Sequence, residues 1–174
     1  MRVYLDNVAA SGRVVGDLAP EGEMAALRSI ESAHRSGALK MVTSRESWRE
    51  QERTKDPVKR ATLEAARGEL SAVVSDHVVL GFNSVEGPHG TMAVGPLISD
   101  IVDEALFADL KSMGLRDSDA KHFMYAFANA NACDRFVTLD SDFIDRRHSL
   151  EARCPSLRIM KPSELVAELG IAAA

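Results

Sequence analysis

Carboxylate side chains gather at the ends of β-like segments in this 174-residue chain, and they are the groups best suited to chemistry. Asp6 directly follows Arg2–Leu5, and Asp140 directly follows Phe136–Leu139. The candidate set is Asp6, Glu50, Asp119, Asp140 and Asp142. If these side chains face one point, their repulsion is unfavourable unless a divalent cation neutralises it. Oxygen ligands without cysteine or paired histidine favour Mg²⁺ or Mn²⁺ over zinc.

Each acid also has a plain structural explanation. Asp6 and Asp140 could serve as turn residues. Asp119 could interact only with a helix dipole, and Glu50 could be a solvated helix carboxylate. The metal-site hypothesis is supported by the five acids taken together, because a structural explanation would have to hold separately for each of them.

The elements that would position these acids alternate between β-like and helical patterns. Strands are predicted at Arg2–Leu5, Leu39–Thr43, Phe136–Leu139 and Leu157–Met160. Helices are predicted over about 20–34, 44–53, 57–70, 98–113, 117–130 and 162–169. This alternation predicts an α/β fold, a three-layer α/β/α sandwich around a central, mainly parallel sheet. Ligands bind outside the carboxyl ends of such strands, which is where the acids stand.

Two local patterns add to this outline. Residues 73–96 are predicted to form a loop, because residues 81–96 contain four glycines and two prolines. Thr43-x-x-Glu46 is typical of a capping box that begins the next helix, which gives Glu46 a structural role. Since no repeat or long linker divides the chain, residues 1–174 are expected to form one domain.

Composition excludes several classes of protein. The formal net charge of −5 argues against a histone-like nucleic-acid binder. No apolar run approaches the ~20 residues that span a bilayer, and the first residues lack the apolar segment of a secretory signal. The only cysteines, Cys133 and Cys154, are too few for a disulfide framework or a four-cysteine zinc site. We therefore expect a cytoplasmic protein without a membrane partner.

Four runs, in their order along the chain, resemble a PIN domain: VYLDN, VTSRESWRE, GLRDSDAKHFMYAFANANACDRFVTLDSDF and RIMKPSELVAELG. The most specific portion is Asp119-Ala-x-His122 with the helix and strand that follow it. The resemblance covers essentially the whole chain. It departs from the family's pattern in two places. Asn7 directly follows Asp6 where the family usually has Asp-Thr-Asn, and the insert between about 55 and 115 is longer than in the compact family toxins.

The resemblance implies a Mg²⁺- or Mn²⁺-dependent endoribonuclease, because PIN domains are metal-dependent ribonucleases and many are toxins of toxin–antitoxin pairs. The family's acids fall on Asp6, Glu50, Asp119 and Asp140, with Glu46 as the alternative to Glu50. Asp142 would be an accessory metal ligand. RNA, a small antitoxin protein and a second copy of the chain are the implied partners.

Basic and aromatic residues near these motifs are candidates for RNA contacts. The arginines recur at four-residue spacing around Glu50 or follow the Asp140 segment: Arg45, Arg49, Arg53, Arg146 and Arg147. Pairing with neighbouring glutamates on a solvated helix is the alternative explanation for them. Trp48 and Tyr125 are the aromatic residues that could stack on bases.

Two other classes of function fit parts of the pattern. A catalytically silent PIN-like interaction module would share the fold, but nothing would then require like charges to gather. Asp140-Ser-Asp142 is similar to the nucleophile loop of haloacid-dehalogenase-like phosphatases, and Lys161-Pro162 is similar to the receiver domains of two-component signalling. Phosphate labelling of an aspartate would distinguish such Mg²⁺-dependent phosphotransfer proteins from a nuclease.

Overall fold

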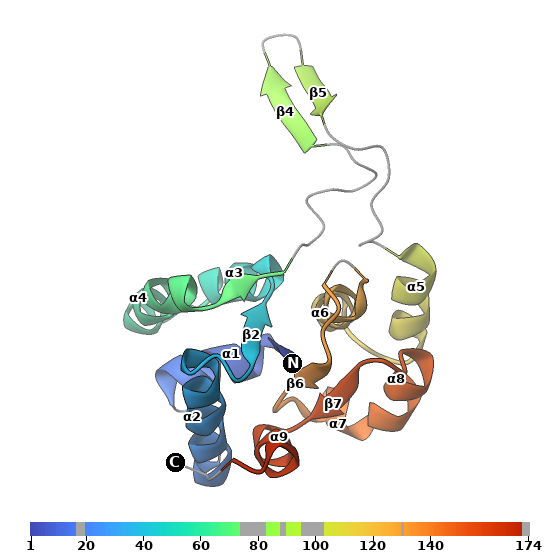
Figure 1. Ribbon diagram of the computed structural model, residues 1–174. Helices are drawn as coiled ribbons and strands as arrows, with labels where there is room; N and C mark the ends of the chain where they lie inside the picture. The colour runs from blue at the N-terminus through green and yellow to red at the C-terminus, as the bar shows by residue number, and fades with distance from the viewer. Residues whose placement is uncertain (17–19, 74–82, 88–89, 95–102, 130, 172–174) are drawn as a thin grey trace.

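Five parallel strands form the central sheet of the computed structural model, which describes residues 1–16, 20–73, 83–87, 90–94, 103–129 and 131–171 (Figure 1). The strands are β1 (Arg2–Leu5), β2 (Lys40–Thr43), β3 (Ser71–Ala72), β6 (Arg135–Val137) and β7 (Arg158–Met160). Their order across the sheet is β3-β2-β1-β6-β7. β1 is therefore the middle strand, and its Tyr4 is in register with Val42 on one side and Phe136 on the other.

Helices cover both faces of the sheet, as the predicted three-layer α/β/α sandwich requires. One face carries α1 (Asn7–Val15), α2 (Glu21–Arg35) and α9 (Pro162–Leu169). The other carries α5 (Glu104–Ser112), α6 (Asp117–Phe127), α7 (Ser141–Asp145) and α8 (Arg147–Arg153). Alternate strand residues enter the two cores: Val3 and Leu5 pack on the first face and Tyr4 on the second. The predicted fold class is confirmed.

The helix α3 (Arg45–Glu52) begins directly after β2 and packs against both α1 and α6, which belong to opposite layers. It is followed by α4 (Pro57–Ala65) and a 3₁₀ turn (Ala66–Glu69). The predicted helix over 57–70 is therefore divided. Its beginning was predicted correctly, because Asp56 accepts hydrogen bonds from the first backbone N–H groups and Pro57 occupies the first turn.

Two local predictions were wrong, and one helix was missed. The capping box does not form: Ser44 is the N-cap residue, and the Thr43 hydroxyl donates to the Leu5 carbonyl at 3.0 Å instead. Strand β6 ends at Val137, so Asp140 stands three residues beyond it. The helix α1 was not predicted at all. It begins under an Asp6 cap and ends at Gly16, whose φ of 76° suits a residue without a side chain.

Part of the predicted loop is an antiparallel hairpin of β4 (Asn83–Gly87) and β5 (Gly90–Val94). The glycines led to the prediction of a loop, but Gly87 and Gly90 pair with one another at the end of the hairpin. Valine and threonine between the glycines favour a strand. The remaining residues of that stretch, and the predicted start of the next helix over 98–102, lie outside the described residues.

Candidate active site

The candidate site lies at the carboxyl ends of β1 and β6, where the chain connections diverge. From β1 the chain passes to β2 on one side, and it returns through β6 on the other. Such a reversal leaves a crevice between the two strand ends, which is where parallel sheets bind ligands. The Asp6 backbone N–H donates to the Val137 carbonyl at 3.1 Å, so the two strand ends are joined at this point.

A pocket of about 300 Å³ opens at this crevice. All four predicted catalytic acids line it, and they come from four separate segments. The lining residues are Asp6, Asn7, Val8, Glu50, Arg53, Arg116, Ser118, Asp119, His122, Asp140 and Phe143. The structure thus brings together acids up to 134 positions apart in the chain (Asp6 and Asp140), as their predicted positions at one edge of the sheet imply.

Asp6 is the most deeply placed of the acids and is 3% exposed. One of its oxygens accepts from the Ala9 N–H at 2.7 Å as the N-cap of α1, and the other accepts from the Thr138 hydroxyl. Burial raises the pKa of Asp6 to about 6, against the lowering effect of these two hydrogen bonds. Its carboxylate is therefore fixed in place, and its charge is costly without a neutralising partner.

Asp140 and Asp119 also lie at the beginnings of helices. Asp140 caps α7 by accepting from the Asp142 N–H at 2.8 Å. Asp119 stands in the first turn of α6 and accepts from the Arg116 N–H. Burial, followed by the negative charge of Asp140, raises the pKa of Asp119, and the charge of Glu50 adds to this. The carboxylates are thus close enough to repel one another, while backbone N–H groups stabilise each of them.

Glu50 is placed by side chains from other elements. Its carboxylate lies 3.3 Å from His122 Nε2, and the Ser118 hydroxyl also hydrogen-bonds to it. Burial acts to raise the pKa of Glu50. The hydrogen bond from His122, with help from Ser118 and Arg53, outweighs burial, so this pKa lies below its ordinary value. The contacts of Glu50 therefore favour its ionised form.

The chemistry of these donors suits Mg²⁺ or Mn²⁺, since all four are carboxylates. Within the described ranges, however, no three His, Cys, Asp or Glu side chains converge closely enough to hold one ion between them. Mg²⁺ commonly keeps several waters and takes only one or two carboxylates directly. The set therefore fits a hydrated ion held partly through water.

Other predicted site residues lie elsewhere. Asp142 is not among the pocket-lining residues, and Arg146 Nη1 lies 3.0 Å from its carboxylate. Arg147 pairs with Glu164 at 2.9 Å. Glu46 is buried and pairs with Arg49 at 3.0 Å. It is not among the residues that line the pocket. The structure therefore favours Glu50 over Glu46 as the site glutamate.

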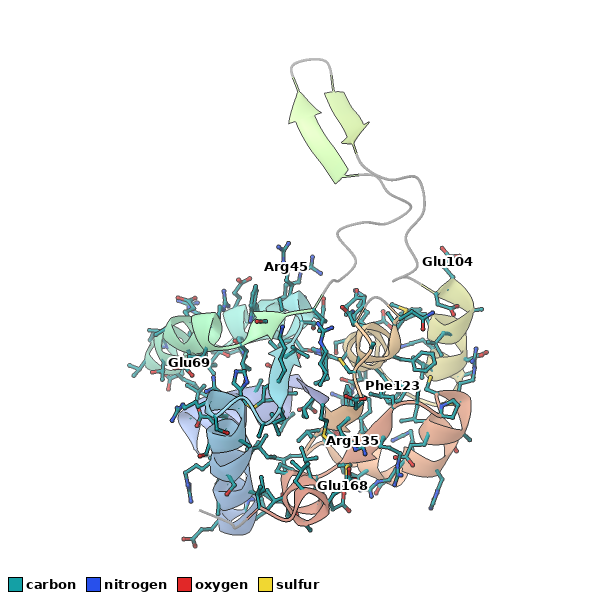
Figure 2. All side chains as sticks on the ribbon, viewed as in Figure 1. Arg45, Glu69, Glu104, Phe123, Arg135 and Glu168 are labelled. Atoms are coloured by element: carbon teal, nitrogen blue, oxygen red, sulfur yellow. The ribbon has the colours of Figure 1, made fainter. Side chains whose placement is uncertain are left out.

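The exposed Arg45 stands outward from the start of α3 (Figure 2). Lys161, the residue behind the similarity to receiver domains, is the exposed N-cap residue of α9 and does not line the pocket. Among the described residues that line the pocket, none is the lysine that a receiver-type phosphotransfer site would use.

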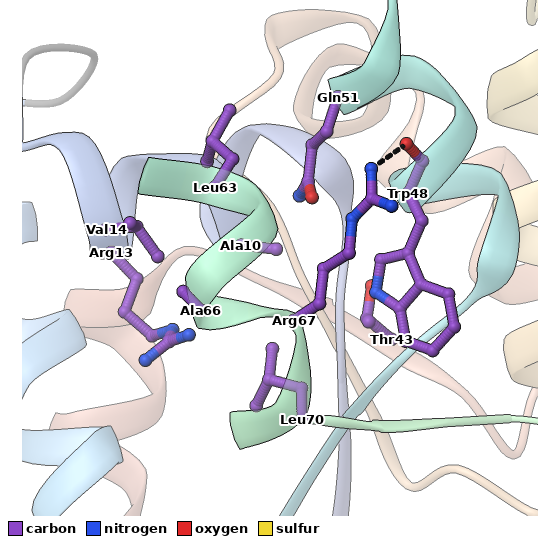
Figure 3. Close-up of a pocket in the computed structure, with 10 residues that line it drawn as sticks. All are labelled: Ala10, Arg13, Val14, Thr43, Trp48, Gln51, Leu63, Ala66, Arg67 and Leu70. Carbon is purple, nitrogen blue, oxygen red and sulfur yellow. Dashed lines mark hydrogen bonds between the residues drawn. The ribbon is translucent and has the colours of Figure 1, made fainter. Parts of the chain in front are cut away.

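The two aromatic residues that could stack on bases are not at the pocket. Tyr125 is only 1% exposed. Trp48 lines a second hollow, shown in Figure 3, together with Arg67, which donates to the Trp48 carbonyl at 2.9 Å. That hollow measures about 10 Å³, which is room for about one water molecule. It offers no space for a base.

The sequence did not single out Arg116, Ser118 or Thr138. Arg116 and Ser118 precede the Asp119 motif by one to three residues, so their proximity to that motif was the available signal. Thr138 lies inside the predicted strand, and in the structure it follows β6 and its hydroxyl donates to Asp6.

No protein-family model, curated protein or solved structure matches the chain. Among the described residues, no helix is both long and apolar enough to cross a membrane.

Replacing either rim arginine with glutamine, as Arg53→Gln or Arg116→Gln, is expected to weaken RNA binding. Both side chains are exposed and line the pocket, so they are placed to contact phosphates. Each variant should lower the slope of log affinity against log salt by about 0.7, the value for one contact with a single strand. Fluorescence anisotropy in an Asp6→Asn background measures binding without cleavage. Arg28→Gln, on the exposed side of α2, is the control and should leave the slope unchanged.

Proposed function

We propose that the chain is a Mg²⁺- or Mn²⁺-dependent endoribonuclease of the PIN type, which hydrolyses RNA phosphodiester bonds at the pocket. One observation carries the proposal: Asp6, Glu50, Asp119 and Asp140, from four separate segments, line a single pocket at the crevice of a parallel sheet. A structural role alone explains each acid but gives no reason for their convergence.

The residues of the chain would divide the work of hydrolysis between them. A bound divalent ion supplies an activated water and offsets charge on the phosphate. Asp6 and Glu50 would hold such an ion, because neighbouring donors already fix both carboxylates. Asp119 and Asp140 would orient its waters. Arg53 and Arg116, at the rim, would bind the phosphates that approach an otherwise acidic pocket.

The proposal also includes partners that the motifs imply. A role as the toxin of a toxin–antitoxin pair, a small antitoxin protein, a homodimer and a cytoplasmic location all follow from the resemblance to PIN domains. The silent interaction module is the competing function. It predicts a folded protein that neither binds Mn²⁺ at the pocket nor cuts RNA.

RNA cleavage by the purified protein tests the proposal. Cleavage should require Mg²⁺ or Mn²⁺ and should stop when EDTA is added. Mapping the products at nucleotide resolution would then identify the RNA bond that is cut. Cleavage that persists in excess EDTA would contradict the proposed chemistry.

The two glutamates of α3 give a matched pair of variants. Glu50→Gln is expected to lower cleavage at least about 100-fold, because it removes a charge from the pocket. Glu46→Gln should keep cleavage close to that of the unmodified protein and should lower stability by about 1 kcal/mol through loss of its Arg49 pair. Initial rates and urea unfolding measure the two effects. The reverse pattern would assign the site glutamate to Glu46.

A further inference from the structure

His122 is a buried histidine with a partner at each ring nitrogen. It lies on α6, three residues after Asp119, and is 2% exposed. Its Nδ1 lies 2.6 Å from the Tyr4 hydroxyl and 3.3 Å from the Ser44 hydroxyl. Its Nε2 lies 3.3 Å from Glu50 Oε2. The ring therefore connects β1, the start of α3 and the pocket.

The partners determine which nitrogen carries the proton. An ionised carboxylate can only accept, so Nε2 must donate to Glu50. A phenol is protonated at neutral pH, so the Tyr4 hydroxyl is available to donate to Nδ1. A neutral ring with its proton on Nε2 satisfies both contacts, with Nε2–H donating to Glu50 and Nδ1 accepting from Tyr4.

A histidine that only filled the core would not need this arrangement. The Tyr4 ring stacks on Phe136 with centroids 5.3 Å apart, and it meets the His122 ring edge-on at 6.0 Å. These contacts alone would accept an apolar side chain. Instead, His122 lines the pocket, and its Nε2 contacts the Glu50 carboxylate. Glu50 belongs to α3, a mostly polar helix.

We propose that His122 is a positioning residue: the Tyr4 hydroxyl holds it as the Nε2–H tautomer, and Nε2–H in turn holds the Glu50 carboxylate toward the pocket. Hydrogen-bonded neighbours of this kind orient the groups that bind a metal. The orientation of Glu50 is independent of what the pocket binds, whereas its effect on metal affinity rests on the proposed function.

Two substitutions separate the two ends of the ring. The amide nitrogen of glutamine reaches about as far as Nε2, so His122→Gln keeps a donor for Glu50. The amide of asparagine reaches only as far as Nδ1, so His122→Asn loses that donor. Mn²⁺ binding, followed by electron paramagnetic resonance, should weaken roughly 10- to 100-fold in His122→Asn and less than about tenfold in His122→Gln. A purely structural role predicts equal losses in both variants, and that result would overturn the proposal.

The tautomer can be read without metal or RNA. Nitrogen-15 NMR of the unmodified protein should show the His122 proton on Nε2. Tyr4→Phe, which keeps the aromatic ring but removes the hydroxyl, should reduce the population of the Nε2–H tautomer without abolishing it, because Glu50 and the Ser44 hydroxyl still favour that tautomer. A proton on Nδ1 in the unmodified protein would overturn the proposal. Failure of the proposed function is a different result: a protein that binds Mn²⁺ with the expected pattern of variants but cuts no RNA.

Discussion

Asp6→Asn is expected to lower RNA cleavage by at least about 100-fold while the protein stays folded. Asp6 reaches the pocket as the most buried of its acids, and the substitution removes its charge. Asparagine is as good an N-cap as aspartate, so α1 should still begin at Asn7. Initial rates at saturating Mg²⁺, with circular dichroism to verify folding, measure the effect.

Asp56→Asn is the matched control. Asp56 also caps a helix with its carboxylate, accepting from the Val58 and Lys59 N–H groups, but it is exposed and does not line the pocket. Its substitution should leave cleavage unchanged. Equal losses in both variants would mean that capping, and not the charge in the pocket, explains the effect of Asp6.

Asp6→Asn is also expected to be more stable than the unmodified protein above pH 6 when no divalent ion is present. The pKa of Asp6 is raised from 3.8 to about 6 in the folded state. The folded protein therefore binds this proton more tightly than the unfolded chain, and its stability falls as pH rises from about 4 to 6. The asparagine variant lacks this loss. The difference in unfolding free energy should grow by up to about 3 kcal/mol over that range.

Urea unfolding in EDTA, at several pH values between 4 and 8, measures this difference. Groups common to both proteins largely cancel in the comparison. Added Mg²⁺ should then stabilise the unmodified protein more than the variant, since ligands stabilise the state that binds them. A difference that does not change with pH would contradict the buried, costly charge at Asp6.

The acids show why part of the site was predictable from sequence. For Asp119 and Asp140, a structural role and a chemical role were treated as alternative explanations. In the structure both side chains accept backbone N–H groups and also line the pocket. Asp140 stands three residues beyond β6 as the N-cap of α7, and Asp119 stands in the first turn of α6, so the starts of these two helices bring both carboxylates to the crevice. Local sequence therefore placed these acids, and helix N-termini reduce the repulsion that we expected only a cation to relieve.

The parts of the site that the sequence did not determine depend on side-chain contacts that form only in the fold. Glu50 and Glu46 lie about one turn apart on α3, and only the packing of α3 against α6 decides which of them meets His122. Arg146 and Arg147 were grouped with the RNA-binding arginines by proximity to Asp140, but their guanidinium groups pair with Asp142 and Glu164. The Arg147–Glu164 pair joins separate segments and has no signature in spacing along the chain, whereas Asp142 and Arg146 stand at the i,i+4 spacing typical of a local ion pair.

The central position of β1 determines when the site can exist during synthesis. β1 pairs with β6, whose register places Tyr4 beside Phe136, so the middle of the sheet closes only after about three-quarters of the chain has been made. Until then Asp6 lacks Thr138, and the pocket lacks Asp140. Pairing over such a separation is slow to form, and domains fold as units as they emerge. An unfinished chain therefore carries no assembled site, and any activity of this pocket is withheld until β6 and the segment after it have been made.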